Sequence, residues 1–274
     1  MESGISKALR LKYDPVALLW SDEKPAVAIE FQGGKWGCVM SAFAQVSAQG
    51  KTAVFDRKTF GCIGGGVGLG FGNQYLNWNG GVDCFYGFLS TGNAYKENAA
   101  AIAEGIARTG RRGAAERFMQ GERYVQSPDL ARKFVEALPM IDIPATYVVF
   151  KPLKAIQEEE TPVTIIALAN ADQLSAFVIL ANYGRGTSDN VIITSAAGCQ
   201  SIGILPYRES MSDRSRAVIG LTDISARNYT KRTLGHELMS FAVPFDMWKE
   251  MEANVKESFL EKEAWLALNG EDRE

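Results

Sequence analysis

The strongest constraint on the fold of this chain is an order of strand, helix and strand that occurs twice along the sequence. The first copy runs PVALLW, SAFAQVSAQG and KTAVFD and leads to Gly61-Cys62; the second runs PVTIIALA, SAFVILANYG and NVIITS and leads to Gly198-Cys199. Short apolar runs between turn residues are typical of buried strands, and a longer run stopped by glycine is typical of a helix. The pattern predicts a mixed α/β (α+β) protein.

We expect one domain over residues 1–274, with a pseudo-repeat over about 15–72 and 147–205. Few residues are identical between the copies, so chance similarity is the alternative. If the repeat is real, two related strand-helix-strand halves would pack about a pseudo-two-fold axis around a shared cleft. Ligands in open α/β sheets bind beyond the carboxyl ends of the strands, so Cys62 and Cys199 would converge on that cleft.

Two helical regions complete the predicted architecture. A helical insertion over about 97–139 includes Ser127-Pro128-Asp129, which is typical of a helix start. A long amphipathic helix is expected over about 246–268, because Met247, Met251 and further apolar residues recur at four-residue steps.

Charge and hydropathy exclude several classes of partner. The net charge is -3 and no half of the chain is strongly basic, so we expect no nucleic-acid partner. The apolar runs are shorter than the roughly 20 residues of a membrane span, and the charged N-terminus does not resemble a signal peptide. A cytoplasmic protein without a membrane partner is expected, and a homo-oligomer is left open. The basic cluster Arg108, Arg111 and Arg112 is interpreted as a solvated helix end.

The four cysteines carry the candidate chemistry. In a reducing cytosol, thiols, metal ligands or catalytic groups are expected rather than disulfides. Cys62 and Cys199 follow glycines at predicted helix starts, and Cys38 has the same context. The field of a helix N-terminus and its N–H groups predict a lowered thiol pKa there, although buried cysteines are often inert. Cys84 is assigned to packing.

A glycine-rich segment and one charged pair supply further candidates. Residues 61–72 read GCIGGGVGLGFG, and neither a GxGxxG nor a Walker pattern fits them. The segment predicts either close helix packing or a wall against which a flat ligand lies. Asp223 and Arg227 are four residues apart, which predicts a surface ion pair or an anion clamp near the cleft.

Several of these segments together resemble one family. They are Cys38 at a helix start, the Gly61-Cys62-x-Gly-Gly step, YVVFKPL at 147–153, the helix with Gln173, Gly198-Cys199, and GLTDISAR at 220–227. They look like the domain-of-unknown-function 169 family over about Pro15 to Trp248. The family has no established activity. The resemblance favours Cys38, Cys62 and Cys199 over Cys84, and the family's frequent occurrence in anaerobes is in keeping with an oxygen-sensitive cluster.

Three hypotheses for function follow. The first is a metal or iron–sulfur site with Cys38, Cys62 and Cys199 as ligands. The second is a binding module for a small organic ligand, and the third is a cofactor-free thiol enzyme with Cys62 as nucleophile. For the second, the expected ligand-binding residues are Gly64, Gly65, Gly66, Gly68, Asp223 and Arg227, together with the aromatic residues Trp36, Phe71, Tyr75 and Trp78.

Overall fold

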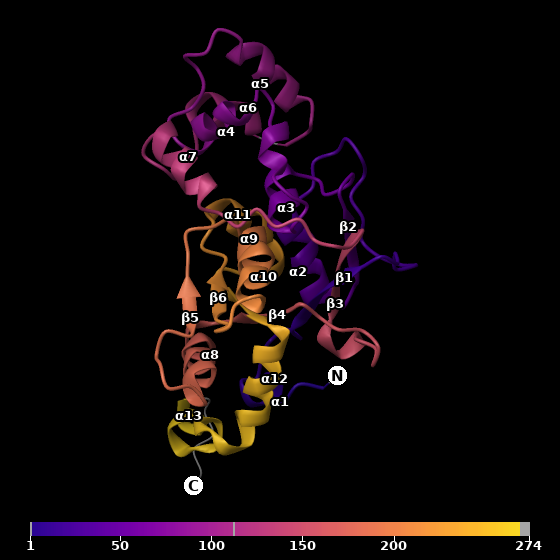
Figure 1. Ribbon diagram of the computed structural model, residues 1–274, viewed down its shortest axis with the longest axis vertical. Coiled ribbons are helices and arrows are strands. Elements are labelled where there is room, and N and C mark those ends of the chain that lie inside the picture. Colours follow the sequence, from indigo (N-terminus) through magenta and orange to yellow (C-terminus); the bar gives the residue numbers. More distant parts are fainter. Residues whose placement is uncertain (1, 112, 269–274) are drawn as a thin grey trace.

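A seven-stranded mixed β-sheet lies at the centre of the computed structural model, which describes residues 2–111 and 113–268 (Figure 1). The strand order is β2-β3-β1-β4-β7-β6-β5, and neighbouring strands are antiparallel except for the parallel pair β5 and β6. The strands are β1 (Val16–Ser21), β2 (Ala53–Asp56), β3 (Tyr147–Pro152), β4 (Thr164–Ala169), β5 (Val191–Ile193), β6 (Ala217–Gly220) and β7 (Met239–Pro244). The predicted mixed α/β fold class is confirmed.

Helices cover both faces of the sheet, so alternate residues of a strand are buried on opposite sides. Val16 and Leu18 of β1 pack with α2, whereas Ala17 and Leu19 pack with α8 and α12. Among the described residues, no helix is both long enough and apolar enough to cross a membrane. The helices are α1 (Gly4–Ala8), α2 (Val39–Gln49), α3 (Ile63–Gly68), α4 (Val82–Leu89), α5 (Ala99–Ala107), α6 (Ala114–Gln120), α7 (Pro128–Glu136), α8 (Ala171–Tyr183), α9 (Gly198–Ile202), α10 (Ile204–Ser210), α11 (Ile224–Leu234), α12 (Phe245–Asn254) and α13 (Glu263–Leu268).

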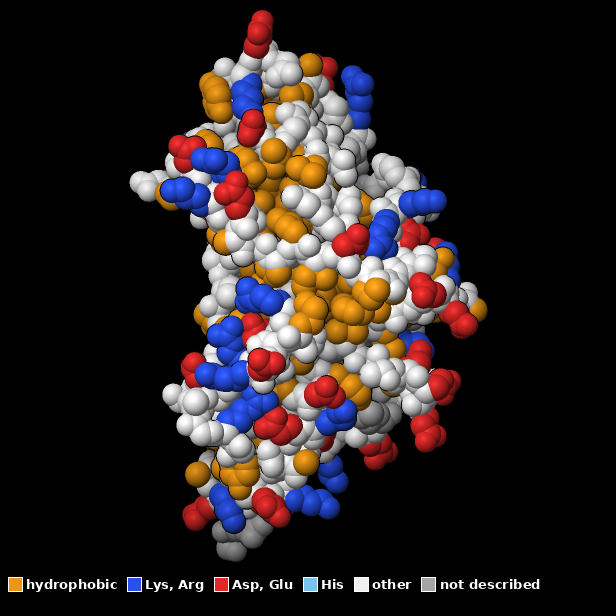
Figure 2. All heavy atoms as spheres, in the orientation of Figure 1, with side chains coloured by type: hydrophobic (Ala, Val, Ile, Leu, Met, Phe, Trp, Pro, Cys, Tyr) orange, Lys and Arg blue, Asp and Glu red, His pale blue; other side chains and the backbone are white. Residues whose placement is uncertain are grey.

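Helices α4 to α7 gather at one end of the long axis of the molecule, above the sheet in Figure 1, and α8, α12 and α13 lie at the other end. The start of α7 at Ser127-Pro128 is as predicted, and the Ser127 hydroxyl accepts the N–H of Leu130. The helical part begins before the predicted boundary at residue 97, because α4 precedes it. On the face in Figure 2, hydrophobic side chains gather over the upper and middle parts of the molecule, and charged side chains crowd the lower part.

The two copies of the predicted repeat share an element order but not an equivalent position on the sheet. Their first strands, β1 and β4, are antiparallel neighbours. A two-fold axis that relates such neighbours stands perpendicular to the sheet and would leave both following helices on one face. Instead, α2 and α8 lie on opposite faces. The predicted arrangement of two related halves around a shared cleft is therefore not confirmed, and the duplication stays a hypothesis.

The predicted C-terminal helical region is present, but it is not one continuous helix over 246–268. Helix α12 ends at Asn254, two 3₁₀ turns follow at Val255–Glu257 and Phe259–Glu261, and α13 comes last. Between the turns, the Ser258 hydroxyl donates to the Val255 carbonyl and accepts the N–H of Leu260. A serine side chain that bonds to nearby backbone in this way competes with the helical hydrogen bonds, so the helix breaks there.

Candidate functional site

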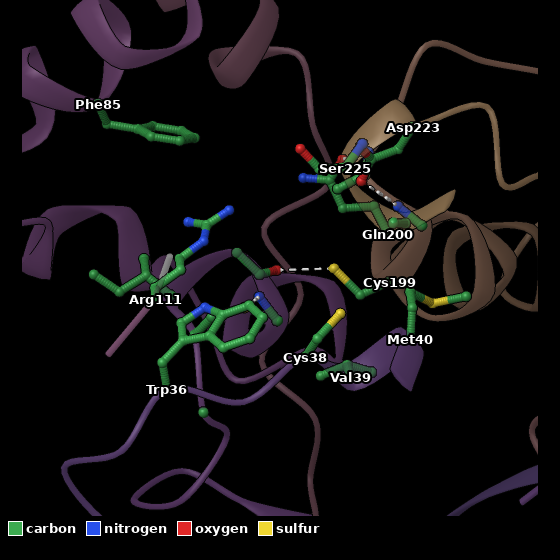
Figure 3. A pocket seen from close by; sticks show the side chains of 18 of the residues that line it. Trp36, Cys38, Val39, Met40, Phe85, Arg111, Cys199, Gln200, Asp223 and Ser225 are labelled. Atoms are coloured by element: carbon green, nitrogen blue, oxygen red, sulfur yellow. Dashed lines mark hydrogen bonds between the residues drawn. The ribbon is translucent and has the colours of Figure 1, made fainter. Parts of the chain in front are cut away.

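A cavity of about 510 Å³ lies where the helical part of the molecule meets the N-terminal ends of α2, α3, α9 and α11. The residues that immediately precede these four helices, Cys38, Cys62, Ala197 and Asp223, all line it. Side chains of α4 and α7 form the opposite wall. The volume is within the range of small-molecule sites, roughly 300–1,000 Å³. The cavity is therefore the candidate functional site (Figure 3).

Two of the Gly-Cys steps are held together by the ring of Phe31. A Cβ atom on Gly37 would lie 2.7 Å from this ring, and one on Gly61 would lie 2.5 Å from it. Gly61 also has a φ of +83°, and its carbonyl accepts the N–H of Gly37 at 3.2 Å. Only glycine fits such contacts, so these two positions bring Cys38 and Cys62 to the same wall of the cavity.

The glycines of α3 serve both of the purposes that the glycine-rich segment predicts. A Cβ atom on Gly68 would lie 2.7 Å from Cys199 Sγ, and Gly65 and Gly66 are also in close contact with neighbouring side chains. These three glycines permit tight packing, which includes the approach of α9. Gly64 differs, because a Cβ there would meet no atom within 4 Å, and Gly64 and Gly65 line the cavity. The Cys199 thiol donates to the Gly64 carbonyl at 3.2 Å, which fixes the sulfur beside the glycine wall.

The cavity brings Cys38, Cys62 and Cys199 together, but their predicted lowered pKa values are wrong. Burial raises the pKa of Cys62 to about 11, although its sulfur accepts the N–H of Gly65 at 3.0 Å. Burial also raises the pKa of Cys38, and that of Cys199 well above its ordinary value. The loss of water around the sulfur outweighs the field of a helix that is only six residues long in α3.

The structure gives no support to the predicted metal site. Within the ranges 2–111 and 113–268, no group of three or more His, Cys, Asp or Glu side chains could hold a metal ion. Cys84, which the sequence assigns to packing, is buried in the core, and Lys96 Nζ donates to its sulfur at 3.3 Å.

Asp223 and Arg227 lie on the same helix but do not form the predicted pair. Asp223 is the N-cap residue of α11. Its carboxylate accepts the N–H groups of Ser225 at 2.8 Å and of Gly198 at 3.3 Å, and the second bond connects α11 to α9. Arg227 donates instead to backbone carbonyls, including that of Leu238 at 3.2 Å, and it does not line the cavity. Both side chains therefore hold neighbouring backbone in place. Asp223 lines the cavity but Arg227 does not, so the two residues do not form the predicted anion clamp.

The predicted aromatic wall is largely present. Trp36, Tyr75 and Trp78 line the cavity, whereas Phe71 is 2% exposed and belongs to the core. The ring of Tyr75 stacks on Phe85 of α4, with 4.1 Å between the ring centroids. This contact joins the 3₁₀ turn Gln74–Asn77, which follows the glycine-rich segment, to the helical part, so the cavity is framed by rings from both.

The sequence interpretation missed four charged residues that line the cavity, namely Lys35, Lys58, Arg111 and Glu122. Arg111 does not belong to a solvated helix end but lines the cavity from the loop between α5 and α6. Arg108 is exposed as expected, and Arg112 lies outside the described residues. Glu122 also lines the cavity, its side chain is 7% exposed, and burial raises its pKa. The flanking Gly110 and Gly113 were the available signal, because glycines mark a loop rather than a helix end.

Comparison with known proteins assigns a family but no activity. The family model DUF169, described as uncharacterised ArCR, matches residues 4–254. No curated protein and no solved structure matches the chain. The expected resemblance, which covered about Pro15 to Trp248, is thus confirmed. Because the match extends over most of its length, the chain belongs to the DUF169 family.

Proposed function

We propose that this protein binds a small organic ligand in the cavity between α4–α7 and the ends of α2, α3, α9 and α11. The observation that carries the proposal is the cavity itself, whose volume of about 510 Å³ suits a metabolite or a small cofactor. Sites of this kind combine a mainly apolar lining with a few polar groups that orient the ligand.

The character of the lining supports this proposal. Aromatic rings come from both sides, with Trp36 and Trp78 from the loops and Phe85 and Phe88 from α4. Gly64 has no atom within 4 Å of its Cβ direction, which leaves a smooth backbone surface for a flat molecule. A ligand enclosed in this way would bury much of its apolar surface, which is the main favourable contribution to binding.

A fluorescent probe tests the proposal. N-phenyl-1-naphthylamine is neutral and apolar, and its emission rises when it leaves water. We expect saturable binding to the wild-type protein and its loss in Gly64→Leu, whose side chain would fill the cavity. Gly105→Leu is the matched control, because Gly105 is exposed on α5 and a Cβ there also meets no atom within 4 Å.

Both variants must melt cooperatively at a temperature near that of the wild-type protein. The proposal is contradicted if Gly64→Leu binds the probe as well as the wild-type protein does. It is also contradicted if Gly64→Leu and Gly105→Leu reduce the binding equally. In either case the probe would bind elsewhere on the surface.

A second candidate, carried over from the sequence, is a thiolate-bound metal or an iron–sulfur cluster on Cys38, Cys62 and Cys199. Its support is that all three cysteines line one cavity, but among the described residues they form no group that could hold a metal ion. Anaerobic reconstitution with iron and sulfide tests it. A brown protein whose colour disappears in Cys62→Ser but not in Cys84→Ser would support it, and a colourless product would contradict it.

The third hypothesis, a cofactor-free thiol enzyme, loses its physical basis. A nucleophilic cysteine reacts as the thiolate. With a pKa of about 11, Cys62 is a neutral thiol at physiological pH.

A further inference from the structure

Arg111 is a cation in the cavity that forms no ion pair with a carboxylate among the residues that the structure describes. It is half-buried and reaches into the space between Trp36 and Phe85 (Figure 3). Its guanidinium carbon lies 5.4 Å from the centre of the Trp36 ring and 5.9 Å from that of Phe88. Aromatic faces stabilise a guanidinium, but they do not neutralise its charge.

The hydrogen-bonding capacity of Arg111 is also mostly unused within the protein. A guanidinium carries five N–H donors and stays charged at physiological pH. Arg111 Nε donates to the Tyr229 hydroxyl at 3.4 Å, and within the described part of the chain its two Nη atoms donate no hydrogen bond to protein. Two Nη donors side by side match the two oxygens of a carboxylate or of a phosphate.

The two acids that line the cavity are engaged elsewhere. Glu122 lies 3.3 Å from Arg117 Nε and accepts the Ser225 hydroxyl at 3.2 Å. Asp223 accepts two backbone N–H groups, as described above. Neither carboxylate forms an ion pair with Arg111 within 4.0 Å, although the charge of Glu122 stabilises the charged form of Arg111 from a longer distance. The Nη donors of Arg111 are therefore left for a molecule that enters the cavity.

A second positive feature faces the same space. Helix α2 is 11 residues long, and Cys38 immediately precedes its first residue. Cys38, Val39 and Met40 all line the cavity, so the positive end of the α2 dipole adds to the charge of Arg111.

We infer that the ligand is a flat organic oxyanion, a carboxylate or a phosphate ester, whose acid group binds the Nη atoms of Arg111. Its unsaturated body lies against Gly64 and the surrounding rings. The inference rests on the proposed function and adds the chemical class of the ligand to it.

A pair of related probes tests the inference. 8-Anilino-1-naphthalenesulfonate carries an anionic group that N-phenyl-1-naphthylamine lacks, and both report binding by fluorescence. We expect Arg111→Met to lower the affinity for the anionic probe at least about tenfold, which is the ordinary effect of losing a charge-assisted hydrogen bond. The affinity for the neutral probe should change by less than about twofold, because methionine retains an apolar side chain in place of the arginine stem.

Two further variants exclude trivial explanations. Arg108→Met removes the same net charge at a side chain that is 82% exposed, and it should bind both probes as the wild-type protein does. Arg111→Lys keeps the charge without the planar fork and should restore part of the affinity for the anionic probe. Competition by 2-naphthoate and by 2-naphthyl phosphate, with 2-naphthol as the neutral comparison, then separates carboxylate from phosphate recognition.

The failures of the two proposals are distinguishable. If Arg111→Met and Arg108→Met affect the anionic probe equally, or if 2-naphthol competes as well as both anions, the inference about Arg111 is overturned while the cavity remains a ligand site. If the wild-type protein binds neither probe in a way that depends on Gly64, the proposed function itself is overturned.

Discussion

At the scale of single residues, Cys62 illustrates a conflict between local position and burial. Its sulfur caps α3 and accepts the N–H of Gly65, both of which favour the thiolate. The same sulfur is enclosed by the cavity wall, and nearby Cys38 disfavours a second negative charge. Burial prevails, and the pKa of Cys62 rises to about 11.

Alkylation of Cys62 should therefore be slow at neutral pH. A pKa near 11 leaves roughly a hundredfold less thiolate at pH 7.5 than a free cysteine has. We expect the rate of labelling by iodoacetamide to keep rising above pH 9, where that of glutathione levels off. Peptide mapping by mass spectrometry follows Cys62 in the wild-type protein. A rate that reaches its plateau below pH 8 would contradict the raised pKa.

At the scale of elements, the approach of α3 to α9 depends on the position of each glycine along α3. Gly68 faces Cys199, including its backbone, whereas Gly64 one turn earlier faces open space. The two glycines belong to the same i, i+4 series, so a sequence pattern treats them alike. Because only Gly68 of the two is in close contact with a neighbouring helix, a side chain added there would clash, whereas one added at Gly64 would not.

Replacement by alanine should destabilise the protein at Gly68 but not at Gly64. In Gly68→Ala, the new methyl group would lie 2.8 Å from the Cys199 carbonyl carbon, and we expect a loss of roughly 1–3 kcal/mol in the free energy of unfolding. Gly64→Ala should be neutral or stabilising by up to about 1 kcal/mol, because alanine is the better helix former. Urea denaturation measures both. Equal losses would show that α3 does not pack as described.

At the scale of the whole molecule, the candidate site belongs to no single element. One wall consists of α4 and α7, and the other consists of the starts of α2, α3, α9 and α11. Residues far apart along the chain, such as Phe85 and Asp223, face the same space (Figure 3). A ligand in the cavity would therefore contact both the helical part and the sheet-bearing part.

Hydrogen exchange should record this double contact. With 8-anilino-1-naphthalenesulfonate bound, we expect slower amide exchange in peptides from α4 and α7 and also in peptides that contain the starts of α9 and α11. A ligand that bridges two walls opposes their separation, and exchange requires local opening. Protection confined to one wall would place the probe outside the cavity. Gly64→Leu, with the same probe concentration, supplies the unprotected reference.

Much of the secondary structure could be predicted from the sequence, because it depends on local patterns. The apolar runs that became β1 and β4, the glycine stop of α2 at Gly50 and the serine cap of α7 are properties of a few neighbouring residues. The three cysteines and Gly64 were also identified from sequence, and all four line the cavity.

The tertiary structure alone decided which face of the sheet each helix covers, which groups surround Arg111, and the pKa values of the cysteines. Packing placed α2 and α8 on opposite sides of the sheet, although their sequences share a pattern. Burial is a property of the assembled cavity, so the raised pKa of Cys62 and the unused Nη donors of Arg111 have no local signature. Hydrophobic periodicity specifies which residues leave water, whereas the energy of a charge depends on every group that the fold brings near it.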